Sequence, residues 1–146
     1  MKNNKYDSLK LENQICFPLY AASNLIVRKY KPLLDKLDLT YTQYITMLVL
    51  WEINSINVKE LGNKLFLDSG TLTPLLKKLE QKGYIKRERS KEDERNLIIS
   101  ITQKGKNLQD AALEVPKEMS KCVNLTSDEA ISLYKILYKI LNKEEK

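Results

Sequence analysis

Histidine is absent from the 146 residues of this chain, and cysteine occurs only twice, as Cys16 and Cys122. Histidine is the commonest general base and the commonest metal ligand in proteins, so its absence disfavours acid–base catalysis and metal binding. The two cysteines are far apart and form no CxxC motif, and in a reducing cytosol we expect both to be free thiols. We therefore expect a non-enzymatic protein with no catalytic residues, no metal site and no cofactor.

Long apolar runs are missing as well. No stretch approaches the roughly 20 apolar residues that a helix needs to span a bilayer. The N-terminal residues, MKNNKYD, contain no apolar segment of the kind found in secretory signals. A chain of 146 residues is nevertheless long enough to bury one core without disulfides or metal. The sequence predicts a single cytoplasmic domain with no membrane partner.

Positive charge is concentrated in the middle of the chain. Residues 59–106 contain twelve of the 25 lysines and arginines but only seven of the 19 acidic residues, an excess of +5, whereas the rest of the chain has an excess of only +1. Cations that neutralise phosphates release counterions, so this clustering favours a nucleic acid as partner. An ordinary solvated charged surface is the alternative.

Apolar periodicity predicts helices on the N-terminal side of this basic region. Residues 9–31 form one long amphipathic pattern, which Pro18 should bend or restart and Pro32 should end or kink. Thr40 and Gln43 fit a capping box, so a helix is expected from residue 41 to about residue 53. Asn57-Val58-Lys59-Glu60 suggests another capped start, for a short helix that carries Leu61, Leu65 and Phe66.

The basic region itself reads as a helix followed by a hairpin. The segment DSGTLTPLLKKLE, residues 68–80, predicts a helix that begins either at Asp68-Ser69 or at Thr73-Pro74, and Gly83 fits the position just after its end. Alternating apolar residues then predict a hairpin of residues 84–89 and 97–101 with a charged tip. A helix that fits the major groove, beside a two-stranded wing, is a device for reading duplex DNA.

Two more helices are predicted after the hairpin. One runs from Thr102 to about Cys122 with a kink at Pro116, and the other follows a capping box at residues 126–129. Together with residues 9–31, these helices carry more apolar surface than one small monomer can easily bury, which favours a homodimer. Packing of these faces within one chain is the alternative. The predicted fold class is mainly α with a small β-wing, a winged helix-turn-helix.

The order of these elements resembles that of the MarR-type winged-helix regulators. Residues 93–105, DERNLIISITQKG, resemble the wing signature of that family, D-x-R followed by a hydrophobic strand and T-x-x-G. Three further segments resemble the organic-hydroperoxide-sensing OhrR branch: LENQICF at 11–17, LTYTQY at 39–44 and LDSGTLTP at 67–74. The resemblance implies one domain over residues 1–146, with a winged helix-turn-helix at 41–102 and dimerisation helices at 9–38 and 103–146. It also implies a homodimer on a pseudo-palindromic operator in double-stranded DNA.

The candidate DNA contacts divide by chemistry. Short polar groups at Ser69, Thr71 and Thr73 suit base edges, and Gly70 permits close approach of the backbone. The cations that we expect at phosphates are Lys77, Lys78, Arg87 and Arg89. By resemblance, Arg95 at the wing tip enters the minor groove and Asp93 fixes its orientation; an ion-paired hairpin tip is the alternative.

The candidate sensing residue is Cys16. It lies near the start of its expected helix, where partial positive charge favours a thiolate, and Tyr20 follows one turn later on the same face. By resemblance, Tyr30 and Tyr41 direct phenol hydroxyls at the thiolate, with Tyr41 coming from the partner subunit. All three tyrosines have core packing as an alternative role, and so does Cys16 as a small buried hydrophobe.

The resemblance implies a regulator, expected to be a repressor, that releases its operator when an organic hydroperoxide oxidises Cys16. Cys122, from the other subunit, or a small cellular thiol then traps the sulfenic acid as a disulfide. One alternative is the same repressor gated by a small aromatic ligand, with Cys16 structural. Another is a thiol peroxidase, which would leave the basic helix and wing unexplained.

Overall fold

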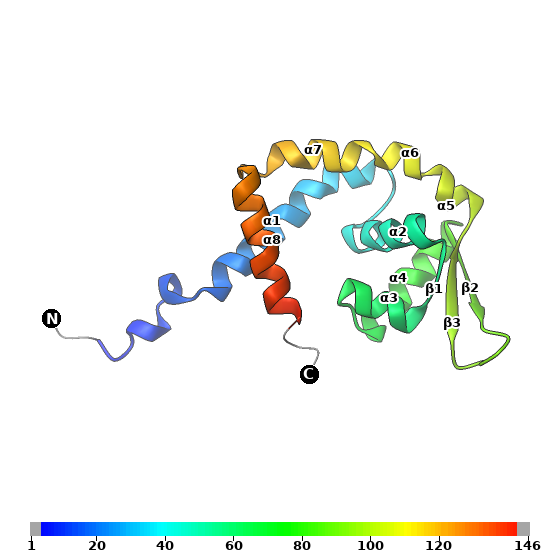
Figure 1. Ribbon diagram of the computed structural model, residues 1–146, viewed down its shortest axis with the longest axis horizontal. Helices are drawn as coiled ribbons and strands as arrows, with labels where there is room; N and C mark the ends of the chain where they lie inside the picture. The colour runs from blue at the N-terminus through cyan, green and yellow to red at the C-terminus, as the bar shows by residue number, and fades with distance from the viewer. Residues whose placement is uncertain (1–3, 143–146) are drawn as a thin grey trace.

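The computed structural model describes residues 4–142, in which helices dominate and a three-stranded sheet lies at one end (Figure 1). Helices α2, α3 and α4 gather with the sheet in one lobe, whereas α1 and α7 run beside each other along the other side. The elements are η1 (Asp7–Leu9), η2 (Leu11–Asn13), α1 (Cys16–Asp35), α2 (Tyr41–Ile53), β1 (Ser55–Asn57), α3 (Val58–Leu65), α4 (Ser69–Gln81), β2 (Ile85–Arg89), β3 (Leu97–Ile101), α5 (Gln103–Asn107), α6 (Gln109–Ala112), α7 (Glu114–Cys122) and α8 (Ser127–Leu141). The predicted fold class, mainly α with a small wing, is confirmed.

Helix α1 begins later and ends later than its periodicity predicts. Before it, the side-chain amides of Asn13 and Gln14 donate to the carbonyls of Asp7 and Ser8, both at 2.6 Å, and hold two 3-10 turns in place of an α-helix. The expected end near Pro32 is wrong, because α1 continues to Asp35. Proline removes only one helical hydrogen bond, and the residues after it bury apolar side chains in the core.

Pro18 causes no interruption of α1. It is the third residue of the helix, in the first turn, where backbone N–H groups have no acceptor within the helix. The loss of a donor at this position therefore leaves the helix intact. The expected restart near Pro18 is confirmed, because the predicted helix breaks after Asn13 and α1 begins at Cys16, two residues before the proline.

Capping side chains define the helices of the winged lobe as predicted. Thr40 and Gln43 form a capping box at the start of α2, and Asn57 accepts from the backbone N–H of Lys59 at 2.7 Å at the start of α3. Asp68 is the N-cap of α4, so the alternative start at Thr73-Pro74 is wrong. Gly83 follows α4 with a φ of 79°, the left-handed conformation that a glycine adopts without strain.

The sheet has the order β1–β3–β2, and both pairs of strands are antiparallel. The hairpin of β2 and β3 was predicted, with Ile85 opposite Ile101 and Arg89 opposite Leu97. The short strand β1 was not predicted, because three residues are too few to show alternation. The core lies between the sheet and the helices of the lobe, with leucines of α4 packed against it. Its fully buried members include Met47, Leu50, Leu61, Leu76, Leu79, Ile85 and Ile99.

The segment after β3 consists of three helices in place of the single helix expected from Thr102 to Cys122. Helix breaks occur at Leu108 and Leu113, and the predicted kink at Pro116 is therefore wrong in position. The pyrrolidine ring of a proline acts on the preceding turn, because it removes the hydrogen bond to the carbonyl four residues earlier. The break at Leu113 falls within that preceding turn.

Helix α8 follows the predicted capping box, in which Thr126 and Glu129 satisfy each other's backbone N–H groups. Residues 143–146, which complete the predicted dimerisation segment 103–146, lie outside the described residues, as do residues 1–3 of the predicted domain. None of the helices that the structure describes is both long and apolar enough to cross a bilayer.

Candidate nucleic-acid interface and thiol site

Helix α4 presents two chemically different faces. Leu72, Leu75, Leu76 and Leu79 are buried against the lobe. The predicted DNA-reading residues lie on the other face, and all of them are exposed: Ser69, Gly70, Thr71, Thr73, Lys77 and Lys78. The polar side chains cluster in the first turns and the lysines follow one turn later. An exposed polar end with flanking cations is the arrangement that base readout and phosphate contact require.

The first turn of α4 is organised by Asp68. Its carboxylate accepts from the backbone N–H of Thr71 at 2.7 Å, and this hydrogen bond lowers the pKa of Asp68 below its usual range. The Thr73 hydroxyl donates to the carbonyl of Ser69 at 2.9 Å, so its proton is already used within the helix. Thr73 can therefore meet a base edge only as an acceptor or through its methyl group.

The wing tip is shaped by Asp93. Its carboxylate accepts from the backbone N–H of Arg95 at 3.0 Å. Asp93 therefore holds the backbone of Arg95 in place. Nearby, Nη1 of Arg89 donates to the carbonyl of Glu94 at 2.7 Å and ties the strand to the tip. Arg95 itself is exposed. The tip is thus a hydrogen-bonded turn that displays one arginine to solvent.

Arg87, the other arginine of β2, has a carboxylate partner on α4. Its Nη2 lies 2.8 Å and its Nε 2.9 Å from Oε2 of Glu80, while its backbone N–H donates to Oε1 at 3.2 Å. These hydrogen bonds lower the pKa of Glu80. The pair joins the wing to α4, a role that the sequence pattern did not reveal. The DNA contact predicted for Arg87 stays a prediction. The positive charge of Arg87 is paired with the carboxylate of Glu80.

Cys16 is the first residue of α1 and is exposed, which excludes the buried-core role within one chain. Its neighbours on the helix are also exposed, with 43% of Phe17 and 67% of Tyr20 accessible. A thiol at a helix start within an open apolar surface is accessible to an apolar oxidant. Tyr20 lies one turn away, as predicted.

Tyr30 and Tyr41 contact each other far from Cys16. Their ring centroids are 4.9 Å apart, and Tyr44 packs against Tyr30 at 5.8 Å. Burial raises the pKa of both Tyr30 and Tyr41. Phenol hydroxyls are protonated hydrogen-bond donors at neutral pH even at their ordinary pKa of about 10. Tyr30 is four turns along α1 from Cys16, a distance of about 21 Å. The phenol pair can reach a Cys16 thiol only if that thiol belongs to another copy of the chain.

Cys122 is also remote from Cys16 within one chain. It is the last residue of α7 and exposed, and its carbonyl accepts from Nζ of Lys29 at 3.1 Å. Lys29 lies about 20 Å along α1 from Cys16. Two cysteines can form a disulfide only when their Cα atoms are within about 7 Å. A Cys16–Cys122 disulfide therefore requires two chains or a large rearrangement.

Many apolar side chains are exposed on α1 and α8, the two outer helices. None of the residues of α8 is buried, although the helix has an amphipathic sequence. Exposed large apolar side chains occur along α1 and α8: Phe17, Leu19, Tyr20, Leu25, Val27, Ile131, Leu133, Tyr134, Ile136, Tyr138, Ile140 and Leu141. Exposed apolar side chains in this number on two helices indicate an interaction site.

Comparisons with known proteins agree with this geometry. A family model described as "Transcriptional regulator SarA/Rot" matches residues 28–112. The chain is 48% identical to the "Organic hydroperoxide resistance transcriptional regulator" of Bacillus subtilis, over 94% of each protein. It is 47% identical to the "HTH-type transcriptional regulator SarZ" of Staphylococcus saprophyticus, over 91% of each.

Solved structures are similar over the whole chain. Reduced AbfR bound to DNA shares 38% sequence identity with a TM-score of 0.79, covering 98% of this chain and 100% of AbfR. Disulfide-formed AbfR shares 36% identity with a TM-score of 0.68, covering all of both chains. The similar proteins thus include one whose structure is known both on DNA and in an oxidised form.

Proposed function

Since the chain belongs to the SarA/Rot family of winged-helix transcriptional regulators, we propose that it is a cytoplasmic homodimeric repressor that releases its operator when an organic hydroperoxide oxidises Cys16. The predicted resemblance to the hydroperoxide-sensing branch is confirmed by the similarity to the Bacillus regulator. Membership of a family of transcriptional regulators also rules against the thiol peroxidase alternative. The observation that carries the sensing proposal is the place of the Cys16 thiol at the start of α1, outside the core of its own chain and beside the apolar face that we assign to the dimer.

DNA reading falls to α4 and the wing. Two copies of α4, related by the two-fold axis of the dimer, enter major grooves at two half-sites about one helical turn apart. Ser69, Gly70, Thr71 and Thr73 meet base edges, while Lys77 and Lys78 meet phosphates. Arg95 enters the adjacent minor groove from the wing tip. The pseudo-palindrome of the operator follows from the symmetry of the dimer.

The dimer forms through the outer helices. Large apolar residues of α1 and α8 remain exposed in the part of the chain that the structure describes, and a second copy of the chain covers them. This organisation corresponds to a single domain over residues 1–146, with dimerisation segments at 9–38 and 103–146 around a winged helix-turn-helix at 41–102. The interface also supplies the second chain that the geometry of the thiol requires.

The sensing reaction takes place at the sulfur of Cys16. The thiolate attacks one oxygen of the hydroperoxide, the O–O bond breaks, and the alkoxide leaves and is protonated to the alcohol. The sulfur is oxidised to sulfenic acid and the hydroperoxide is reduced. Tyr20 of the same helix, with Tyr30 and Tyr41 of the partner, donates phenol hydrogen bonds that stabilise the thiolate without adding a charge.

The sulfenic acid is then trapped by a thiol. Attack of that thiol on the sulfenic sulfur forms a disulfide and releases water. The attacking thiol is Cys122 of the partner subunit or a small cellular thiol. The new bond at the dimer interface changes the spacing of the two α4 helices, and the loss of base contacts worth about 1–3 kcal/mol each releases the operator.

A gel-shift or anisotropy titration with organic hydroperoxide tests this function. The probe is a duplex selected from a random-sequence DNA pool by repeated binding to the reduced wild-type protein. We expect cumene hydroperoxide to release the wild-type protein and to leave Cys16→Ser bound. In Cys122→Ser, release that becomes slower or reversible by mild reductant supports a resolving role for Cys122. Peroxide-dependent release of Cys16→Ser would contradict the proposal.

A surface cavity favours a second candidate function, gating by a small aromatic ligand. The cavity has a volume of about 250 Å³ and lies between α1 and the start of α2, lined by Val27, Arg28, Leu34, Leu39 and Tyr41 among others. The lining also includes Lys31 and Asp35, which form an ion pair at 2.9 Å. Apolar walls with the cation Arg28 beside this pair suit an aromatic carboxylate. Alkylation of Cys16 separates the two functions, because ligand-gated release survives it and oxidative release does not.

A further inference from the structure

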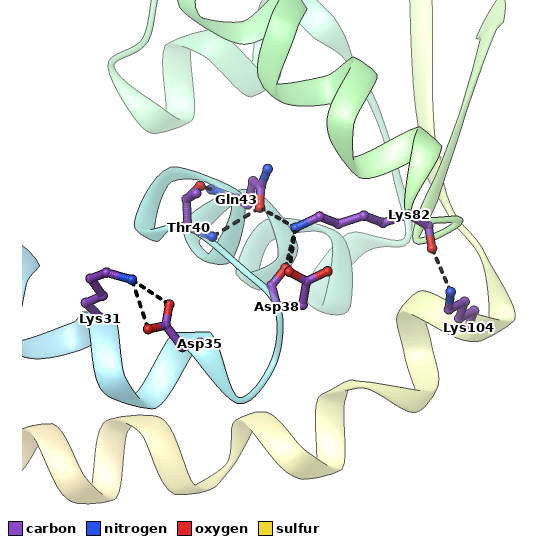
Figure 2. A network of polar contacts seen from close by, with 7 residues as sticks. All are labelled: Lys31, Asp35, Asp38, Thr40, Gln43, Lys82 and Lys104. Carbon is purple, nitrogen blue, oxygen red and sulfur yellow. Dashed lines mark hydrogen bonds and ion pairs between the residues drawn. The ribbon is translucent and has the colours of Figure 1, made fainter.

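Lys82, the residue that directly follows α4, is bonded to the turn between α1 and α2 (Figure 2). Its Nζ donates to the backbone carbonyl of Asp38 and, at 3.2 Å, to Oε1 of Gln43. The Asp38 carboxylate lies 3.4 Å from the same nitrogen. The lysine side chain is only 26% exposed. A single ammonium group thus joins the end of the recognition helix to two points on another part of the chain.

The turn that Lys82 holds connects the outer helix α1 to the winged lobe. Asp38 has a φ of 53°, and the backbone N–H of Leu39 donates to the carbonyl of Leu34 at 3.1 Å, which closes the turn after α1. Gln43 belongs to the capping box that begins α2. Lys82 therefore contacts the turn through which α1 leads into the DNA-binding lobe.

The same end of α4 is anchored from its other side. The carbonyl of Lys82 accepts from Nζ of Lys104 on α5 at 2.8 Å, as Figure 2 shows, and the carbonyl of Gly83 accepts from the hydroxyl of Thr102 at 2.6 Å. At the opposite end of α4, Ser69, Gly70, Thr71 and Thr73 are exposed, while Leu72 is buried in the lobe. The recognition helix is thus bonded to neighbouring elements at its C-terminal end, while its N-terminal end displays the polar side chains proposed for base reading.

The contacts at the C-terminal end of α4 help to determine where its N-terminal reading end lies. Helix α4 has 13 residues and is about 20 Å long. A rotation of about 10° at the C-terminal end therefore moves the reading end by roughly 3 Å, which is the whole length of a hydrogen bond. Base contacts made by the first turns cannot tolerate a displacement of that size.

We propose that Lys82 is a positioning residue for operator reading, which fixes α4 on the α1–α2 turn and transmits the position of α1 to the recognition helix. Lys82 does this through Asp38 and Gln43 and does not itself contact phosphate. The inference rests on operator reading by α4 and is independent of the oxidation of Cys16.

The test compares Lys82→Met with Lys31→Met in the full-length dimer. Lys31 is a matched control, because it also pairs with an aspartate, Asp35 at 2.9 Å, but within α1 and without contact to α4. Operator affinity is measured at several salt concentrations on the duplex selected with wild-type protein. We expect Lys82→Met to weaken binding about fivefold or more with an unchanged salt slope, and Lys31→Met to remain within about twofold of wild type.

Two results would overturn the inference. One is an unchanged operator affinity in Lys82→Met. The other is a salt slope reduced by about two per dimer, one for each lysine removed, which would make Lys82 a phosphate ligand. Lys82→Gln, which retains a donor, serves as the second variant if Lys82→Met does not fold, and Lys82→Arg should restore most of the affinity.

Failure of the inference about Lys82 can be distinguished from failure of the proposed function. If the wild-type dimer binds the duplex but ignores peroxide, the role of Cys16 is refuted while the affinities of the Lys82 variants still decide the role of the lysine. If peroxide releases the wild type and Lys82→Met binds DNA as tightly as wild type, only the role of Lys82 is refuted.

Discussion

Arg87 on β2 and Glu80 on α4 form a salt bridge in which Nη2 lies 2.8 Å from Oε2, and the pair joins the wing to the recognition helix. The backbone N–H of Arg87 also donates to Glu80, so the contact fixes the strand as well as the side chain. The two elements that we propose to read DNA are thereby held in one geometry. Simultaneous entry into a major groove and a minor groove depends on that geometry.

Glu80→Gln should weaken operator binding, because the wing and α4 lose their mutual alignment while no positive charge is removed. We expect a decrease of a few-fold, with the salt slope of binding unchanged. Fluorescence anisotropy with the selected duplex measures both quantities. The control is Glu88→Gln, which removes the same charge at an exposed position of β2, next to Arg87. An affinity equal to that of wild type would show that the pair has no role in alignment.

The same pair should make stability depend on pH in the acid range. The hydrogen bonds from Arg87 hold the pKa of Glu80 below its ordinary value of 4.5 in the folded state. The stabilisation is therefore fully present above that ordinary value and is lost as pH falls through the lowered one. Thermal unfolding at fixed protein concentration should show wild type more stable than Glu80→Gln at pH 7, with the difference shrinking below about pH 4. A difference that stays constant down to acid pH would contradict this linkage.

Arg95→Ala should weaken operator binding about tenfold without changing the melting temperature, because the exposed side chain reaches DNA while Asp93 holds the backbone of the turn. Lys91→Ala, which removes a neighbouring exposed cation of the wing, should have a smaller effect. Anisotropy and thermal unfolding check the two expectations. Unchanged affinity at fixed salt would remove Arg95 from the interface.

Ile136→Asp should dissociate the dimer, because it places a charge in the exposed apolar face of α8, where 56% of the isoleucine is accessible in one chain. The expected result in analytical ultracentrifugation is a shift towards monomer, together with loss of operator binding. Lys135→Asp, a charge change at the adjacent residue, is the control. A dimer that persists in Ile136→Asp would place the interface elsewhere.

Local chemistry made much of this molecule predictable from the sequence. The capping residues Thr40, Asn57 and Asp68 begin their helices where their hydrogen-bonding groups indicate. The alternation in residues 97–101 likewise marks a strand that is half-buried in the sheet. Signals of this kind act over three or four residues, so they can be read without knowledge of tertiary contacts.

The features that were not predicted depend on contacts between distant elements. Proline was expected to end α1 near Pro32, but burial of Leu34 outweighs the loss of one hydrogen bond. Strand β1 exists only because Ile56 pairs with Ile99 of β3. The contacts of Lys82 with Asp38 and of Arg87 with Glu80 likewise join residues that no local pattern links.

The central claim is that the Cys16 thiol reacts with an organic hydroperoxide while the dimer holds DNA. Mass spectrometry of the operator-bound dimer, treated with one equivalent of cumene hydroperoxide in the presence of a sulfenic-acid trap, tests this claim directly. We predict that the trap modifies the peptide that contains Cys16 and that the operator is released in proportion to that modification. Release of the operator with Cys16 unmodified, or full modification of Cys16 with the operator still bound, would contradict the account.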